Sequence, residues 1–132
     1  MRAVLFALAL ACVATLAPAQ DRSPEEVIGR QIEAFRLDDF ETAFTFAHPS
    51  IRDIFRTPEN FGRMVRQGYP MVWRPAEVDY LDQRSDGGRL MQDVRIVDAA
   101  GRVFVLRYSM IETPEGWKIG GVQILEQAGV SA

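Results

Sequence analysis

The chain has 132 residues, with 15 basic and 18 acidic side chains and a formal net charge of −3. These charges are spread along the sequence without basic runs, which argues against nucleic acid or an anionic membrane surface as a partner. One cysteine, Cys12, and one histidine, His48, provide neither a disulfide framework nor a set of metal ligands. We therefore expect no cofactor and no bound metal.

Residues 1–19 are predicted to be a secretory signal peptide. Arg2 precedes an apolar run that ends at Leu16, and Ala17-Pro18-Ala19 has the small-x-small pattern that signal peptidase recognises. The run is shorter than the roughly 20 apolar residues of a membrane-spanning helix. We expect cleavage after Ala19, a single periplasmic or secreted domain over residues 20–132, and no membrane span. A lipoprotein signal acylated at Cys12 is the alternative.

Two helix signatures follow this segment. Ser23-Pro24-Glu25-Glu26 is a capping box with proline at the first helical position, and an apolar stripe follows it at helical spacing. Asp39 is placed to cap a second helix, which His48-Pro49 ends because the residue before proline leaves the α region. The stripe of the first helix consists of Val27, Ile28, Gln31, Ile32 and Phe35.

The helical half continues to residue 70. Ser50 is expected to cap a short turn that reaches Phe55, and Thr57-Pro58-Glu59-Asn60 repeats the signature of a capped helix start. Gly68-Tyr69-Pro70 then closes the helical half.

From Met71 onward the apolar period changes to two, which predicts strands. The first strand is expected over Val72 to Gln83, and Pro75 places that part at a sheet edge or a bulge. Ser85-Asp86-Gly87-Gly88 predicts a hairpin turn into a second strand, Arg89 to Asp98. Two further strands, joined by a tight turn at Thr113-Pro114-Glu115-Gly116, complete an antiparallel meander.

Alternation assigns the faces of these strands. Gln92 is in phase with Val94 and Ile96, and Tyr108 is in phase with Phe104 and Leu106, so both polar side chains are expected to point inward. In the last strand Trp117 and Ile119 are out of phase with Val122 and Ile124. Gly120-Gly121 is the natural place for the extra residue, and we predict a β-bulge there in a strongly curved sheet.

Helices that precede an antiparallel sheet predict an α+β domain in which the helices cover one sheet face. The chain also resembles the nuclear transport factor 2-like superfamily, and within it a bacterial domain family of unknown function. The resemblance implies an α+β cone around a central cavity, with four curved strands. Where the family pattern has a small residue such as Ser before the proline, this chain has His48, which argues against a catalytic histidine. The motifs that carry the resemblance are Phe46-Ala47-His48-Pro49-Ser50-Ile51, Phe61-Gly62-Arg63-Met64-Val65, Gly68-Tyr69-Pro70, Trp73-Arg74-Pro75, Gln92-Asp93-Val94, Tyr108 and Gly116-Trp117-Lys118-Ile119-Gly120-Gly121-Val122.

Three residues are candidates for lining a ligand pocket: Tyr69, Gln92 and Tyr108. A buried amide needs partners, so Gln92 either orients a ligand or bonds to helix backbone near Tyr69 or Pro70. Tyr108 either polarises a ligand carbonyl or packs in the core with one partner for its hydroxyl. Tyr69 either lines the cavity mouth or fixes the turn before Pro70.

The leading functional hypothesis is a non-enzymatic exported module that binds a small apolar ligand or a protein partner, with no residue assigned as catalytic. The resemblance implies one alternative, a small isomerase or dehydratase with Asp79 as base, if Asp79 rather than Val78 and Tyr80 faces inward. A second alternative is a purely structural domain. The outer face of the third strand, with Val103, Val105 and Ile111, would support a homodimer.

Overall fold

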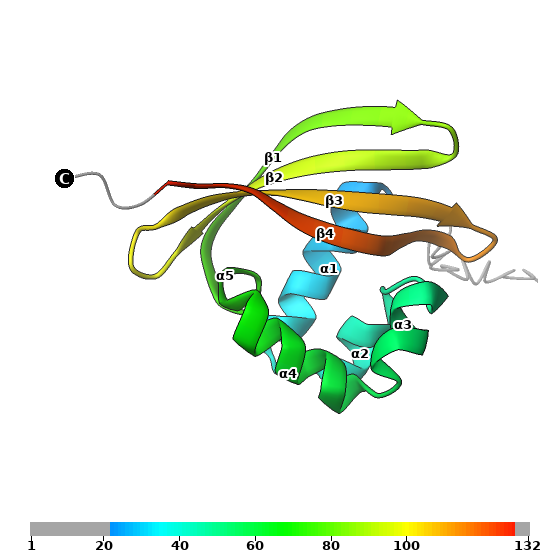
Figure 1. The fold of residues 1–132 in the computed structure, drawn as a ribbon, viewed down its shortest axis with the longest axis horizontal. Helices are drawn as coiled ribbons and strands as arrows, with labels where there is room; N and C mark the ends of the chain where they lie inside the picture. Colours follow the sequence, from blue (N-terminus) through cyan, green and yellow to red (C-terminus); the bar gives the residue numbers. More distant parts are fainter. Residues whose placement is uncertain (1–21, 129–132) are drawn as a thin grey trace, which may run out of the picture.

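The computed structural model describes residues 22–128, and within this range every helix precedes every strand (Figure 1). The predicted signal peptide and Cys12 lie outside the described residues. The helices are α1 (Pro24–Arg36), α2 (Phe40–Thr45), α3 (Pro49–Phe55), α4 (Pro58–Gly68) and α5 (Pro70–Trp73). The strands are β1 (Pro75–Asp86), β2 (Arg89–Asp98), β3 (Val103–Thr113) and β4 (Gly116–Ala128).

Side-chain caps fix the starts of the helices. The Ser23 hydroxyl accepts the Glu26 amide at 3.2 Å, the Asp39 carboxylate accepts the Thr42 amide at 3.1 Å, and Thr57 caps α4 in the same way. These three predicted caps are confirmed. The predicted cap at Ser50 is wrong, because α3 begins at Pro49 and its cap is His48, whose Nδ1 accepts the Ser50 amide at 3.1 Å.

The segment Met71 to Trp73 was predicted to be extended and is helical instead. Pro70 has the φ angle of a first helical position, and the amides of Val72 and Trp73 both bond to the Tyr69 carbonyl, at 2.9 and 3.2 Å. Met71 and Val72 are both buried, which adjacent residues achieve more readily on a helix than on a strand with alternating faces. The first strand therefore begins at Pro75 rather than at Val72.

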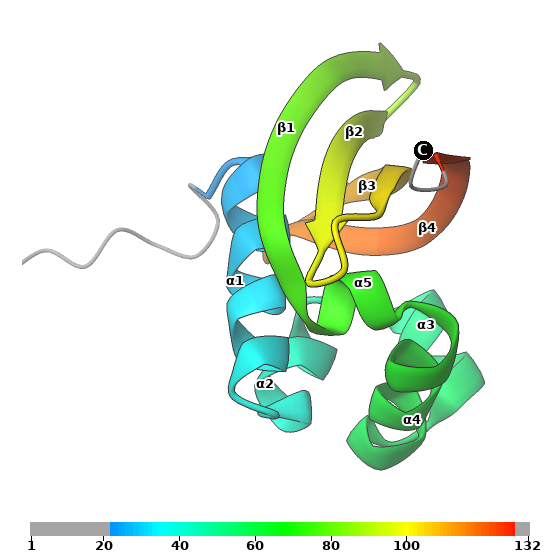
Figure 2. The ribbon, with the colours of Figure 1, turned by 90° about the vertical axis from the view of Figure 1, so that its left-hand side faces the viewer.

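The strands form one antiparallel sheet in the order β1-β2-β3-β4, with the helices on one side of it (Figure 1). Figure 2 shows how strongly β1 and β4 bend along their length. The register shifts between Pro75 and Glu77, so Pro75 lies at a bulge of an edge strand as predicted. The register between β3 and β4 also shifts, because Ser109 pairs with Gly121 whereas the next residue, Met110, pairs with Ile119. This confirms Gly120 as the extra residue of a bulge.

The inward faces of β2 and β3 supply the centre of the core. Gln92, Val94 and Ile96 alternate with more exposed residues along β2, and Tyr108 lies directly opposite Gln92 in the ladder. Both Gln92 and Tyr108 are fully buried, as alternation predicted. The helices cover this face with further buried side chains: Val27, Ile28, Ile32 and Phe35 of α1, and Phe61 and Val65 of α4.

Candidate ligand-binding cavity

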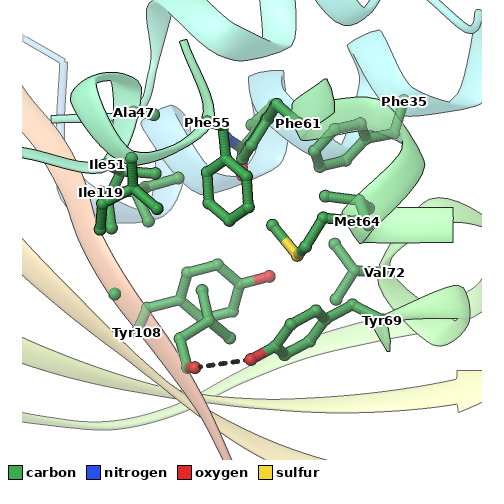
Figure 3. Close-up of a pocket in the computed structure, with 15 residues that line it drawn as sticks. Phe35, Ala47, Ile51, Phe55, Phe61, Met64, Tyr69, Val72, Tyr108 and Ile119 are labelled. Carbon is green, nitrogen blue, oxygen red and sulfur yellow. Dashed lines mark hydrogen bonds between the residues drawn. The ribbon is translucent and has the colours of Figure 1, made fainter. Parts of the chain in front are cut away.

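A cavity of about 290 Å³ lies between the helices and the β3–β4 part of the sheet (Figure 3). Its walls are almost entirely apolar, and every helix except α2 contributes to them. The lining residues are Gln31, Phe35, Ala47, Ile51, Ile54, Phe55, Phe61, Met64, Val65, Tyr69, Val72, Tyr108, Ile119, Gly121 and Val122.

Backbone hydrogen bonds between β4 and the α2–α3 connection close one side of the cavity. The His48 amide donates to the Ile119 carbonyl at 2.8 Å, and the Ile119 amide donates to the Phe46 carbonyl at 2.9 Å. Ile119 can make these bonds because β4 is an edge strand with unpaired backbone groups on its outer side. Lys118 adds a bond from its ammonium group to the Thr45 carbonyl at the end of α2, at 2.9 Å. These contacts hold α3 against the sheet and so place Ile51 in the cavity wall.

Phenylalanine rings form a second wall. The Phe61 ring lies 5.9 Å from both Phe35 and Phe55 and 5.4 Å from Phe44, in tilted arrangements. Such spacings are those of favourable aromatic pairs, which add to the free energy gained by burial. Ile54, in contrast, is 68% exposed, so it lies where the cavity meets solvent.

Tyr69 lines the cavity and also fixes the turn between α4 and α5. Its hydroxyl donates to the Val122 carbonyl at 3.2 Å, the bond drawn in Figure 3. Its amide donates to the Val65 carbonyl at 2.8 Å, which ends α4. Tyr69 thus has both roles considered from the sequence, and its hydroxyl proton already forms a hydrogen bond within the protein.

Tyr108 presents a different hydroxyl to the same cavity. The side chain is fully buried, and its oxygen has no hydrogen-bond partner among the described residues. Figure 3 shows the hydroxyl projecting into the space bounded by Phe55, Met64 and Tyr69. Burial, with smaller contributions from Tyr80 and Tyr69, raises the pKa of Tyr108 far above its ordinary value. The group is therefore a neutral hydroxyl that can donate one hydrogen bond into the cavity.

Gln92 does not line this cavity. Its amide nitrogen donates to the carbonyls of Leu81, at 3.2 Å, and Asp93, at 2.8 Å. Leu81 lies in the part of β1 where the register shifts between Tyr80 and Gln83. The amide thus bonds to strand backbone at a β1 irregularity, not to helix backbone near Tyr69 or Pro70 as the sequence suggested.

Asp79 and His48 also lie away from the cavity. The Asp79 side chain is 58% exposed and forms an ion pair with Arg95 at 3.0 Å on the outer face of the sheet. Val78 and Tyr80, the competing residues, lie on the other face, opposite Ile96 and Val94, so the condition for the isomerase alternative, an inward Asp79, is not met. His48 caps α3 and has Ser50 Oγ 2.8 Å from its Nδ1.

The outer sheet face carries charge as well as apolar side chains. Arg107 forms two hydrogen bonds to the Asp93 carboxylate, at 2.8 and 3.1 Å, between the half-buried valines and Ile111. The Ile111 side chain covers the bulge, since a Cβ atom at Gly120 would collide with it. The homodimer through this face stays a prediction.

One polar cluster was not anticipated from the sequence. The Asp38 carboxylate accepts bonds from the Trp73 indole and the Arg74 guanidinium, both at 2.9 Å, and Arg74 stacks over the Trp73 ring. Arg74 also donates to the Phe35 carbonyl at 2.7 Å. The bond from Trp73, followed by that from Arg74, lowers the pKa of Asp38. Asp38 lies between the two predicted helices, and no local pattern indicates its partner 35 residues away.

Residues 22–128 contain neither a membrane-spanning helix nor a cluster of metal-ligating side chains. No helix in this range is long and apolar enough to span a membrane. In the same range, no three histidine, cysteine, aspartate or glutamate side chains are grouped as metal ligands.

Comparisons with known proteins agree with the fold. A family model described as a domain of unknown function, DUF4864, matches residues 17–132. The solution structure of a SEC-C motif containing protein from Rhodopseudomonas palustris is 18% identical, with a TM-score of 0.57 over 85% of this chain and 84% of that chain. At this identity the likeness shows the fold alone, an α+β domain with a nuclear transport factor 2-like neighbour. No curated protein matches the chain.

Proposed function

We propose a function for a chain that belongs to the DUF4864 family: it is a non-enzymatic, exported module that binds a small apolar ligand in the cavity between α1, α3, α4 and the β3–β4 hairpin. The observation that carries this proposal is the cavity itself, an apolar space of about 290 Å³ that borders the buried core and meets solvent at Ile54. Sites for small ligands are concave, mostly apolar and few in a protein. This cavity is therefore the candidate site.

The lining supports binding rather than catalysis. Among the described residues that face the cavity, the polar side chains are Gln31, Tyr69 and Tyr108, and none of them carries a charge at neutral pH. The Gln31 amide nitrogen donates to the Ala43 carbonyl at 3.1 Å, and Tyr69 donates to Val122. General acid–base catalysis needs a group with a pKa near the working pH, within hydrogen-bond reach of the substrate. With Asp79 on the outer face, the isomerase alternative lacks its base.

The exported location rests on the amino-terminal sequence pattern. An apolar run followed by Ala17-Pro18-Ala19 fits a secretory signal, and the family match begins at residue 17, beside the predicted cleavage position. The sequence after Cys12 contains no cysteine, so the domain depends on its packed core rather than on disulfides in an oxidising compartment. Mass spectrometry of the protein recovered from the periplasm tests this part, and a mature chain that still begins at Met1 contradicts it.

The binding proposal is tested with pentylbenzene as a probe. An engineered cavity of about 150 Å³ binds benzene, so a cavity of about 290 Å³ should hold about twice as many atoms. We expect saturable pentylbenzene binding by isothermal titration calorimetry, with amide chemical-shift changes confined to the lining residues. The variant Met64→Trp fills the cavity from α4 and should abolish the binding.

Arg63→Trp is the matched control, since it adds the same ring at the neighbouring exposed position of α4. It should leave pentylbenzene binding unchanged. If the unmodified protein does not bind pentylbenzene, or if Met64→Trp binds it as well as Arg63→Trp does, the cavity is not a ligand site and the structural-domain alternative is favoured.

A further inference from the structure

Resting on the proposed function, we infer that the natural ligand is an uncharged apolar molecule with one hydrogen-bond acceptor, such as a ketone or ester oxygen, and that the Tyr108 hydroxyl donates to this acceptor.

The acceptor follows from the state of the Tyr108 hydroxyl. A buried tyrosine oxygen normally has a partner, because leaving a donor unpaired away from water is costly. Tyr108 is fully buried, and no backbone or side-chain acceptor among the described residues reaches its oxygen. The fold directs this group into the cavity and not toward a carbonyl, whereas the neighbouring Tyr69 hydroxyl does find a carbonyl, that of Val122. A ligand acceptor in the cavity would complete the missing bond.

The absence of charge follows from the rest of the lining. No lysine, arginine or histidine is among the described residues that face the cavity. An ionised carboxylate or phosphate placed here would lose its hydration and gain a single neutral donor, which does not compensate a buried charge. Lys118 is adjacent to the lining residue Ile119, but its ammonium group bonds to the Thr45 carbonyl. A carboxylate is therefore disfavoured, and an uncharged oxygen is favoured.

The size of the ligand follows from the volume. About 290 Å³ of space, on the scale of benzene in about 150 Å³, corresponds to about twelve non-hydrogen atoms. The rings of Phe55 and Phe61, with the Met64 thioether, provide walls suited to an aromatic or a flexible aliphatic group. One acceptor on a body of this size leaves most of the ligand surface in apolar contact.

Two probes that differ at a single position test the inference. Valerophenone is pentylbenzene with the methylene beside the ring replaced by a carbonyl group. For each protein, the preference is the ratio of the Kd for pentylbenzene to the Kd for valerophenone. We expect this ratio to be about tenfold larger for the unmodified protein than for Tyr108→Phe, because one neutral hydrogen bond contributes about this factor. We also expect 4-butylbenzoate, the carboxylate of 4-butylbenzoic acid and the anionic probe, to bind more weakly than valerophenone.

Tyr80→Phe serves as the matched control. It removes a tyrosine hydroxyl that lies against Gly29 of α1, outside the cavity lining. The preference for valerophenone over pentylbenzene should survive in this variant. Nuclear magnetic resonance adds a readout that a merely structural role would not move, because the valerophenone carbonyl carbon should shift on binding to the unmodified protein and not to Tyr108→Phe.

The outcomes separate this inference from the proposed function. If pentylbenzene binds and the preference for valerophenone is the same with and without the Tyr108 hydroxyl, the inferred ligand acceptor is overturned. The cavity then remains a binding site. Tighter binding of 4-butylbenzoate than of valerophenone overturns the inference that the ligand is uncharged. Failure of all three probes to bind overturns the proposed function and this inference with it.

Discussion

Gln92 and Tyr108 face each other across the β2–β3 ladder and point to the same side of the sheet, yet they belong to two differently packed regions. We call the surroundings of Gln92, Val94 and Ile96 the packed region. The cavity region is the part of the sheet that carries Tyr108, Ile119 and Val122. In the packed region the neighbouring strand β1 supplies a carbonyl, that of Leu81, to the nitrogen of the buried Gln92 amide, whereas the amide oxygen has no partner among the described residues. In the cavity region the buried Tyr108 hydroxyl has no partner among these residues.

The difference arises from what covers each half of the sheet. Over the β1 side, Tyr80 lies against Gly29 of α1 and Gln83 bonds to Glu25, so strand and helix are in direct contact. Over the β3–β4 side, hydrogen bonds at Ile119 and Tyr69 join the ends of α3 and α4 to the sheet, and the cavity lies between these contacts. A single sheet thus combines a closely packed core with a preformed cavity.

Truncation of matched isoleucines should reveal the contrast most strongly. Ile96 and Ile119 are both buried on the inner face, one in each region. Ile96→Ala is expected to lower the free energy of unfolding by about 2–5 kcal/mol, because it removes contacts and leaves a new void. Ile119→Ala should cost less, because its side chain already borders empty space and has fewer contacts to lose. Urea denaturation of both variants provides the comparison, and equal losses would argue that the cavity is filled by side-chain rearrangement.

Removal of the Gln92 amide should have the next largest effect. Gln92→Met keeps the shape of the side chain but leaves the Leu81 carbonyl without its side-chain donor, and we expect a loss of about 1–3 kcal/mol in the free energy of unfolding. If Gln92 instead served the ligand, the variant would keep its stability and lose the preference for valerophenone over pentylbenzene. Urea denaturation beside calorimetric titration therefore distinguishes the structural role from the ligand role. The structure favours the structural one.

Much of this contrast is outside the reach of sequence reasoning. The inward direction of Gln92 and Tyr108 follows from alternation with apolar neighbours, and the bulge at Gly120 follows from a break in that alternation, so both were predictable from local pattern. The partners of the two groups depend on what lies across the sheet. The acceptor at Leu81 results from an irregularity in β1 that no glycine marks, and the cavity beside Tyr108 results from helices placed by long-range contacts.

The helical half shows the same limit. The caps at Ser23 and Thr57 were predictable because donor and acceptor are three residues apart. The helical turn α5 was missed although Pro70 signals a helix start, because the apolar run of Met71 to Trp73 was assigned to the following strand. The direction of Asp79 was uncertain from the sequence because apolar residues flank it on both sides, and its pairing with Arg95 required the register of β1 on β2.

The smallest effect expected in this series is also the most specific to the cavity region. Tyr108→Phe removes a buried hydroxyl without a partner, so at neutral pH the free energy of unfolding should stay the same or rise by up to about 1 kcal/mol. Tyr69→Phe, the matched change, removes the bond to Val122 and should cost about 0.5–1.5 kcal/mol. A loss on Tyr108→Phe as large as that on Tyr69→Phe would mean that the Tyr108 hydroxyl is satisfied within the protein, and would remove the reason for a ligand acceptor.

Alkaline pH should enlarge the difference between the unmodified protein and Tyr108→Phe. Burial raises the pKa of Tyr108 in the folded protein, whereas in the unfolded chain the phenol ionises near its ordinary pKa of about 10. A raised folded pKa stabilises the protein below the unfolded pKa, and this contribution is lost as the pH rises above about 10. The stability of the unmodified protein should therefore fall relative to that of Tyr108→Phe between about pH 9 and about pH 11, as followed by urea denaturation. A constant difference over this range would show that solvent reaches the Tyr108 hydroxyl, which is buried in the structure.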